Sequence, residues 1–132
     1  MASELKVDKF TGVTTAGSID VVGEGNSTTT NLQQGLAKSW VNFNGTGTIA
    51  TRDSLNVGSL TDTGVGDYTP NFSNNMANAN YSISMMTAND AIRQFILAGY
   101  DTVSSFRIRS QNSSSSQADT SYVYATIHGD LA

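Results

Sequence analysis

Apolar and small polar residues alternate along most of the chain from Ala37 onward, which is the pattern of half-buried β-strands. A continuous apolar run at 95–98 fits a further strand that is buried on both faces. Gly, Asn and Asp residues that favour turns separate these segments at nearly regular intervals. The sequence therefore predicts an all-β fold, an antiparallel β-sandwich of about six to seven strands. The alternating segments are 40–43, 54–57, 67–72, 80–85, 105–109 and 121–128.

Two local features refine this prediction. Residues 87–94 form either a single helical turn or a loop between two apolar strands. Pro70, the only proline, lies inside a strand pattern, and it should mark an edge strand or a strand end because it cannot donate a hydrogen bond to the ladder.

Residues 1–35 differ from the rest, since they carry few large apolar groups and many turn-forming residues. Two short apolar pieces at 5–7 and 19–22 can pair as strands with another partner. We interpret 1–35 as an extended arm that becomes ordered on contact with neighbouring chains, and 36–132 as the β-sandwich domain. A disordered tail is the alternative for the arm. Its candidate anchor residues are Leu5, Val7, Ile19, Val21 and Val22.

Composition narrows the possible partners. Seven Lys and Arg residues against eleven Asp and Glu residues give a net charge of −4, and no basic cluster exists. We therefore expect neither a nucleic-acid partner nor attachment to an anionic membrane. The absence of a long apolar run predicts no membrane insertion and no secretory signal. With no Cys, the chain has no disulfide, no thiol catalysis and no Cys-ligated zinc, so its stability depends on packing and on association between subunits.

The sequence offers little catalytic chemistry. No Gly-x-Ser-x-Gly motif accompanies His128, the only histidine, which we interpret as a strand residue or an inter-subunit hydrogen-bond partner. The segment 62–67 is only superficially like a calcium loop, because it lacks the alternating acids and the terminal Glu, and we expect a hairpin turn there. We expect no cofactor and no enzyme activity. The acids that we expect to cap turns are Asp53, Asp62, Asp67, Asp90, Asp101, Asp119 and Asp130.

Aromatic and basic side chains are better candidates for binding. Tyr122 and Tyr124 share one strand face, opposite an aliphatic set that we assign to the core, so the tyrosines should lie at the surface or an interface. On the strand at 40–43, either Trp40 or the pair Val41 and Phe43 faces outward.

Arg107 and Arg109 lie on the strand face opposite Phe106 and Ile108. They can bind a carboxylate-bearing glycan or an acidic neighbour, or they simply protect an exposed strand from unwanted pairing. The candidate interface or ligand-contact residues are therefore Trp40, Tyr122, Tyr124, Arg107 and Arg109.

The order of several motifs resembles a module of tailed-phage virion proteins, often placed at the tip of tail fibres in phages of aquatic bacteria. The motifs are WVNFNGTGT at 40–48, RDSLNV at 52–57, TDTGVGDYT at 61–69 and NF at 71–72. A strand at 106–108, a Ser/Asn-rich loop at 110–119 and a last strand at 122–127 follow in the same order. The similarity spans about 37–128.

This resemblance implies a structural component of the virion, made in the host bacterial cytoplasm, that forms a homotrimer of β-sandwiches. It implies that the arm attaches the module to other virion proteins, while the sandwich contacts a host-surface glycan or protein. It supplies no catalytic residue. Because no long shaft separates the arm from the domain, a capsid decoration protein or head fibre also fits. A distant similarity to six-stranded snail-type lectins makes a lectin-like carbohydrate-binding protein a third interpretation.

Overall fold

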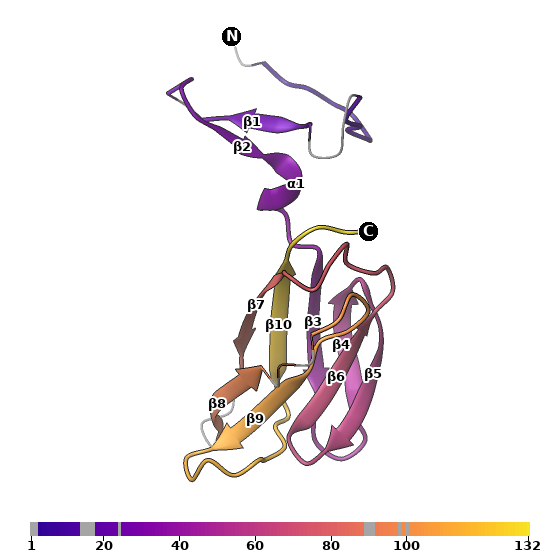
Figure 1. The fold of residues 1–132 in the computed structure, drawn as a ribbon, viewed down its shortest axis with the longest axis vertical. Coiled ribbons are helices and arrows are strands. Elements are labelled where there is room, and N and C mark those ends of the chain that lie inside the picture. Colours follow the sequence, from indigo (N-terminus) through magenta and orange to yellow (C-terminus); the bar gives the residue numbers. More distant parts are fainter. Residues whose placement is uncertain (1–2, 14–17, 24, 89–91, 98, 100) are drawn as a thin grey trace. The chain divides into compact units, whose positions relative to one another are not determined.

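The chain forms two units, Met1–Leu36 and Ala37–Ala132. The computed structural model describes residues 3–13, 18–23, 25–88, 92–97, 99 and 101–132, with the backbone alone for 92–97 (Figure 1).

The first unit contains a short hairpin and one turn of helix. Strand β1 (Asp20–Val22) pairs antiparallel with β2 (Thr29–Asn31), and helix α1 (Leu32–Gly35) follows directly. Asn31 caps this helix, because its side-chain oxygen accepts a hydrogen bond from the backbone N–H of Gln34 at 3.1 Å. The apolar piece at 19–22 thus forms a strand, whose partner belongs to the same chain rather than to a neighbouring one. None of the described side chains of this unit is buried, so they form no core.

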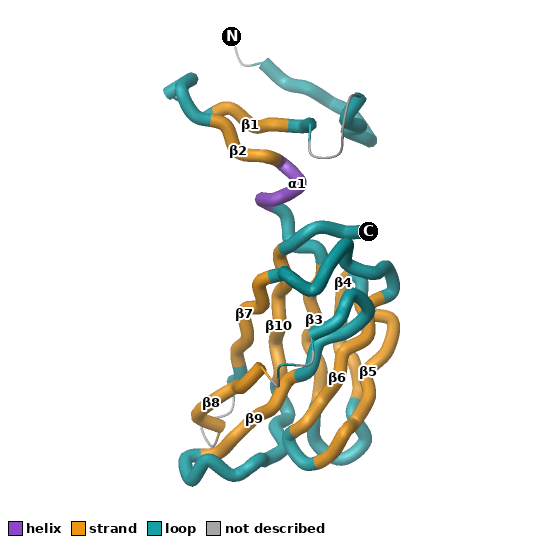
Figure 2. The backbone as a smooth tube through the Cα atoms, in the orientation of Figure 1, coloured by secondary structure: helices purple, strands orange, loops and turns teal. Residues whose placement is uncertain are grey.

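The second unit is a sandwich of two four-stranded antiparallel sheets (Figure 2). The first sheet has the order β4-β3-β10-β7, and the second has the order β5-β6-β9-β8. The all-β antiparallel prediction is confirmed, with eight strands in the described part of this unit rather than six or seven. The strands are β3 (Ser39–Asn44), β4 (Ala50–Leu55), β5 (Val57–Gly64), β6 (Asp67–Phe72), β7 (Ser82–Met86), β8 (Ile92–Leu97), β9 (Ile108–Asn112) and β10 (Val123–His128).

The larger number of strands arises at a corner of the chain, where the alternating pattern predicted one strand and the structure has two. The sequence predicted one strand at 54–57, but the chain turns at Asn56, whose φ of 56° places it in the left-handed region. β4 therefore ends in the first sheet and β5 begins in the second. Asn56 holds the corner with its side chain, which accepts from the backbone N–H of Asn74 at 2.7 Å and donates to the Asn74 carbonyl at 3.0 Å.

Pro70 lies in the interior of β6, not at an edge or a strand end as its chemistry predicted. β6 pairs with β5 on one side and with β9 on the other. The carbonyl of Pro70 accepts from the N–H of Phe106 at 3.2 Å, so the missing proline N–H falls on the β9 side. Regular pairing there stops at Tyr68 and Ile108 and resumes only at a single bridge, which is how a central strand accommodates the proline.

Residues 92–94 do not form part of the helical turn considered for 87–94, because they belong to β8. Residues 89–91 lie outside the described part of the chain. The strand expected at 95–98 is present as far as Leu97, at the edge of the second sheet. The expectation that its side chains are buried on both faces falls outside the described side chains.

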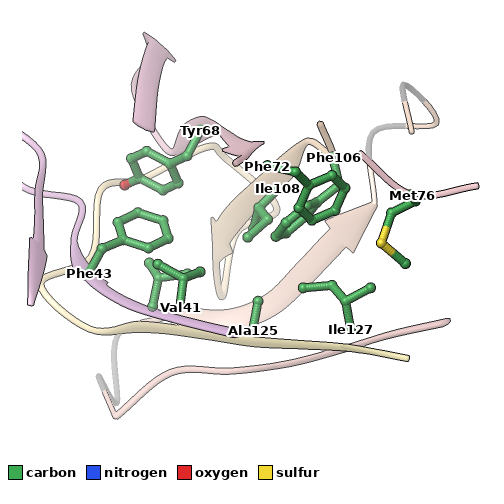
Figure 3. Close-up of a cluster of buried hydrophobic side chains, with 10 residues drawn as sticks. Val41, Phe43, Tyr68, Phe72, Met76, Phe106, Ile108, Ala125 and Ile127 are labelled. Carbon is green, nitrogen blue, oxygen red and sulfur yellow. The ribbon is translucent and has the colours of Figure 1, made fainter. Parts of the chain in front are cut away.

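The core lies between the two sheets, as Figure 3 shows. Phe43 of the first sheet meets Tyr68 of the second edge to face, with ring centroids 5.3 Å apart. Contacts of this kind across the gap make the two sheets one sandwich. The buried apolar residues are Val41, Phe43, Tyr68, Phe72, Met76, Phe106, Ile108, Val123, Ala125 and Ile127.

Candidate functional site

The outward face of the first sheet collects the aromatic candidates. Val41 and Phe43 are buried, which settles the orientation of β3, and Trp40 therefore lies on the outward side and is half-buried. On β10 the aliphatic residues are buried as expected, and Tyr122 and Tyr124 lie on the opposite side.

The two tyrosine rings stack beside a cation. Their centroids are 6.4 Å apart and the planes differ by 20°. The guanidinium carbon of Arg52 lies 4.6 Å from the centroid of the Tyr122 ring, within the range of a cation–π contact. Arg52 also donates from Nη1 to the side-chain oxygen of Asn42 at 3.4 Å. Arg52, Tyr122 and Tyr124 thus form a preorganised row. The Tyr122 side chain in this row remains 42% exposed.

Two apolar side chains extend the row across all four strands. Leu55 of β4 lies opposite Trp40, and Met86 of β7 lies opposite Tyr124, so each shares the outward face of its partner. Both are exposed. The aromatic face is defined here as Trp40, Arg52, Leu55, Met86, Tyr122 and Tyr124. Sequence reasoning missed Arg52, Leu55 and Met86.

The polar neighbours of the aromatic face can form hydrogen bonds with a ligand. Asn42 and Asp53 lie opposite each other on β3 and β4, and Thr126 and Ser84 lie opposite each other on β10 and β7. The positive charge of Arg52 and the negative charge of Asp53 cancel on this face. The aromatic face and these polar neighbours together present apolar ring surface, amide groups and hydroxyl groups. The net charge of these residues is zero.

The outward face of the second sheet carries a charged cluster of Asp67, Arg107 and Arg109. Arg107 binds Asp67 through two parallel hydrogen bonds, at 2.7 Å from Nε and 2.8 Å from Nη2, and Arg109 adds one from Nε at 3.0 Å. The Asp67 side chain is 7% exposed. Burial raises the pKa of Asp67, but the hydrogen bonds and charges of Arg107 and Arg109 outweigh it, and the pKa lies below the usual value.

This cluster corrects two expectations. Asp67 does not cap a turn but holds Arg109 of the neighbouring strand β9 and Arg107, which directly precedes that strand. The arginines do not protect an exposed strand, because β9 lies between β6 and β8. They bind an acidic neighbour, as the other interpretation proposed, and that neighbour belongs to the same chain.

A second polar network closes one end of the sandwich. The Tyr68 hydroxyl lies 2.9 Å from the Gly45 carbonyl and 3.3 Å from Asp119 Oδ1, and it accepts from the backbone N–H of Thr120 at 3.3 Å. Asp119 also accepts from the N–H of Gly66 at 2.6 Å. These contacts join the hairpin between β5 and β6 to the loop before β10. The hairpin turn expected at 62–67 is confirmed, with Asp62 accepting from Gly64 N–H at 3.1 Å.

Asp101 carries an unusual carboxyl group. Its Oδ1 atom is buried and has no hydrogen-bond partner in the described structure. Burial raises the pKa of Asp101, opposed by a hydrogen bond from the backbone of Arg107. Burial and then the Asp101 charge raise the pKa of Tyr81 to about 12. The Tyr81 hydroxyl lies 2.9 Å from the carbonyls of both Thr102 and Ser105.

We expect Asp101 to make the fold less stable as the pH rises. A carboxyl group whose pKa is raised in the folded state contributes stability below its unfolded pKa, and that contribution is lost as the pH rises through the folded pKa. The free energy of unfolding of the wild type minus that of Asp101→Asn should therefore fall from pH 3 to pH 7 in urea titrations. A difference that stays flat or increases would contradict this expectation.

The arm residues lie mostly in solvent. Leu5 is 74% exposed and Val7 is 47% exposed, while Val21 and Val22 on β1 are also exposed. Ile19 is half-buried, and its carbonyl accepts from the N–H of Leu32 at 2.8 Å. The segment 19–22 thus has its partners within the unit, and the segment around Leu5 and Val7 does not use its apolar side chains there.

The described residues contain no group of three or more His, Cys, Asp or Glu side chains placed to bind a metal ion. His128 lies exposed at the end of β10. Within the described ranges, no helix has the length and apolar character that crossing a bilayer requires. Comparison with protein-family models, with curated proteins and with solved structures returned no match.

Proposed function

We propose that this chain is a structural and binding module of a phage virion. In this proposal the arm of residues 1–35 attaches a homotrimer to other virion proteins, and the sandwich binds a host-surface saccharide through the aromatic face. The module is a tail-fibre type and performs no catalysis. The attachment and the trimer follow from the resemblance in motif order between 37 and 128.

One observation carries the binding role, the stacked row of Arg52, Tyr122 and Tyr124 on a sheet face. A sugar ring packs its C–H groups against aromatic carbon and directs its hydroxyls to nearby polar groups. Asn42 and Asp53 provide such groups beside the rings. Because Arg52 and Asp53 cancel in charge, the face is suited to a neutral saccharide rather than to an acidic one.

Removal of one ring tests the saccharide site. We expect Tyr122→Ala to weaken binding to an array of immobilised neutral saccharides about tenfold, because a stacking contact contributes up to about 1.4 kcal/mol. Tyr122→Phe keeps the ring and should bind within about threefold of the wild type. Val65→Ala removes an exposed apolar side chain elsewhere and serves as the control.

Three measurements test separate parts of the proposal. Equal saccharide binding by Tyr122→Ala and the wild type, or no binding at all, would reject the aromatic face as a sugar site. Cryo-electron microscopy of intact particles tests the location, and density for this chain on the capsid rather than on the tail would favour a decoration protein. Light scattering that gives a monomer at micromolar concentration would reject the trimer.

A further inference from the structure

The edge strand β7 differs from the other edges of the sandwich. The two sheets end at β4, β7, β5 and β8. The pairing of β4, β5 and β8 with their neighbours contains register shifts, whereas β7 pairs with β10 over five consecutive residues without one. β7 also contains neither a charged residue nor a proline. Bulges, charges and prolines are the features that keep edge strands from pairing with another chain, and β7 lacks all three.

The inner side of this edge is incompletely covered. Ile83 and Met85 point toward the core and pack against it but are only half-buried. Their partners on β10, Ile127 and Ala125, are buried. A further strand beside β7 with apolar residues facing inward would remove the remaining apolar surface of Ile83 and Met85 from water.

The arm contains a segment with the matching pattern. Leu5 and Val7 alternate with Glu4, Lys6 and Asp8 over five residues, the same length as β7. The Lys6 ammonium lies 3.4 Å from a Glu4 carboxylate oxygen, so these two charged side chains lie on the same side of the segment. Leu5 and Val7 remain exposed within a single chain. This segment has the alternation of a strand but no sheet.

We propose that residues 4–8 of one chain pair with the β7 edge of a second copy and form a fifth strand of its first sheet. Leu5 and Val7 then lie beside Ile83 and Met85, and the charged residues face outward. The new edge carries Glu4, Lys6 and Asp8, and such an edge resists further pairing. The proposal rests on the association of copies of this chain in the proposed function, and it is independent of saccharide binding.

Engineered disulfides test the pairing, because the natural chain has no Cys. Lys6 and Ser84 are the central residues of the two segments, so Cys residues at both positions lie opposite each other whether the strands run parallel or antiparallel. We would mix a tagged Lys6→Cys chain with an untagged Ser84→Cys chain under mild oxidation. The proposal predicts a mixed disulfide-linked dimer on non-reducing gels, formed at least tenfold faster than with Ser59→Cys on β5.

Three results would overturn the proposal. These are the absence of a mixed dimer, formation of the mixed dimer at the same rate as with Ser59→Cys, and crosslinking only within one chain when that chain carries both Lys6→Cys and Ser84→Cys. Saccharide binding is measured in parallel on the same preparations. Loss of crosslinking with binding retained rejects the strand pairing alone, whereas crosslinking without saccharide binding rejects the sugar site alone.

Discussion

Gly66→Ala is expected to lower the free energy of unfolding by about 2–5 kcal/mol. Gly66 has a φ of 61°, where an L side chain costs about 1–2 kcal/mol. An added Cβ would also lie 2.6 Å from the Ala118 nitrogen and 2.7 Å from the Ser110 carbonyl oxygen. Both are backbone atoms, so the β5–β6 hairpin would have to move away from the loop before β10, at about 1–3 kcal/mol for overpacking.

Gly47→Ala is the matched control. Gly47 has a φ of 63°, but an added Cβ there meets nothing within 4 Å. Its cost should be that of the backbone conformation alone, about 1–2 kcal/mol. Urea unfolding of both variants measures the difference. Equal destabilisation by the two substitutions would show that the close approach at Gly66 contributes nothing to stability.

The sequence predicted the strands whose two faces have different environments. β3, β6, β7 and β10 were found because more exposed and less exposed residues alternate along them. β4 and β5 are edge strands with mostly exposed side chains, so their hydroxyl-rich sequence carries no alternation. β4 and β5 can be assigned as strands only from their hydrogen bonding to β3 and β6.

The candidate site was predicted in part for a related reason. Period-two alternation places Tyr122 and Tyr124 on the same face of their strand. It likewise places Arg107 and Arg109 on the same face of theirs. It cannot identify a partner on a different strand, such as Asp67, which is 40 positions from Arg107.

Arg52 was missed because it lies at an irregularity in the pairing, between Thr51 and Asp53, and has no residue opposite it on β3. The register of β3 with β4 shifts between Asn42 and Phe43, and such irregularities re-aim side chains. A pattern that assumes strict alternation does not show where Arg52 points. The structure places it over Tyr122, which turns two tyrosines into the row that carries the proposed binding role.

Asp67→Asn is expected to lower the free energy of unfolding by about 2–3 kcal/mol at pH 7. Removing one partner of a fully buried ion pair costs about 3–5 kcal/mol. The Arg107 and Arg109 side chains are 22% and 34% exposed, so water compensates part of that loss. Asp62→Asn changes an exposed acid at the same hairpin and should stay within about 0.5 kcal/mol of the wild type. Urea unfolding at pH 7 measures both variants.

The pH dependence of Asp67→Asn distinguishes the ion pair from a simple packing effect. The pKa of Asp67 is lowered in the folded state, so its contribution is present above the unfolded pKa of about 4 and is lost as the pH falls through the folded pKa. The stability gap between the wild type and Asp67→Asn should therefore be largest near pH 7 and narrow below about pH 4. Asp101 acts with the opposite sign, so the slope of stability against pH for the double variant Asp67→Asn/Asp101→Asn should lie between the slopes of the two single variants. A gap that is the same at pH 7 and pH 3 would mean that Asp67 stabilises the sheet through its shape and not through its charge.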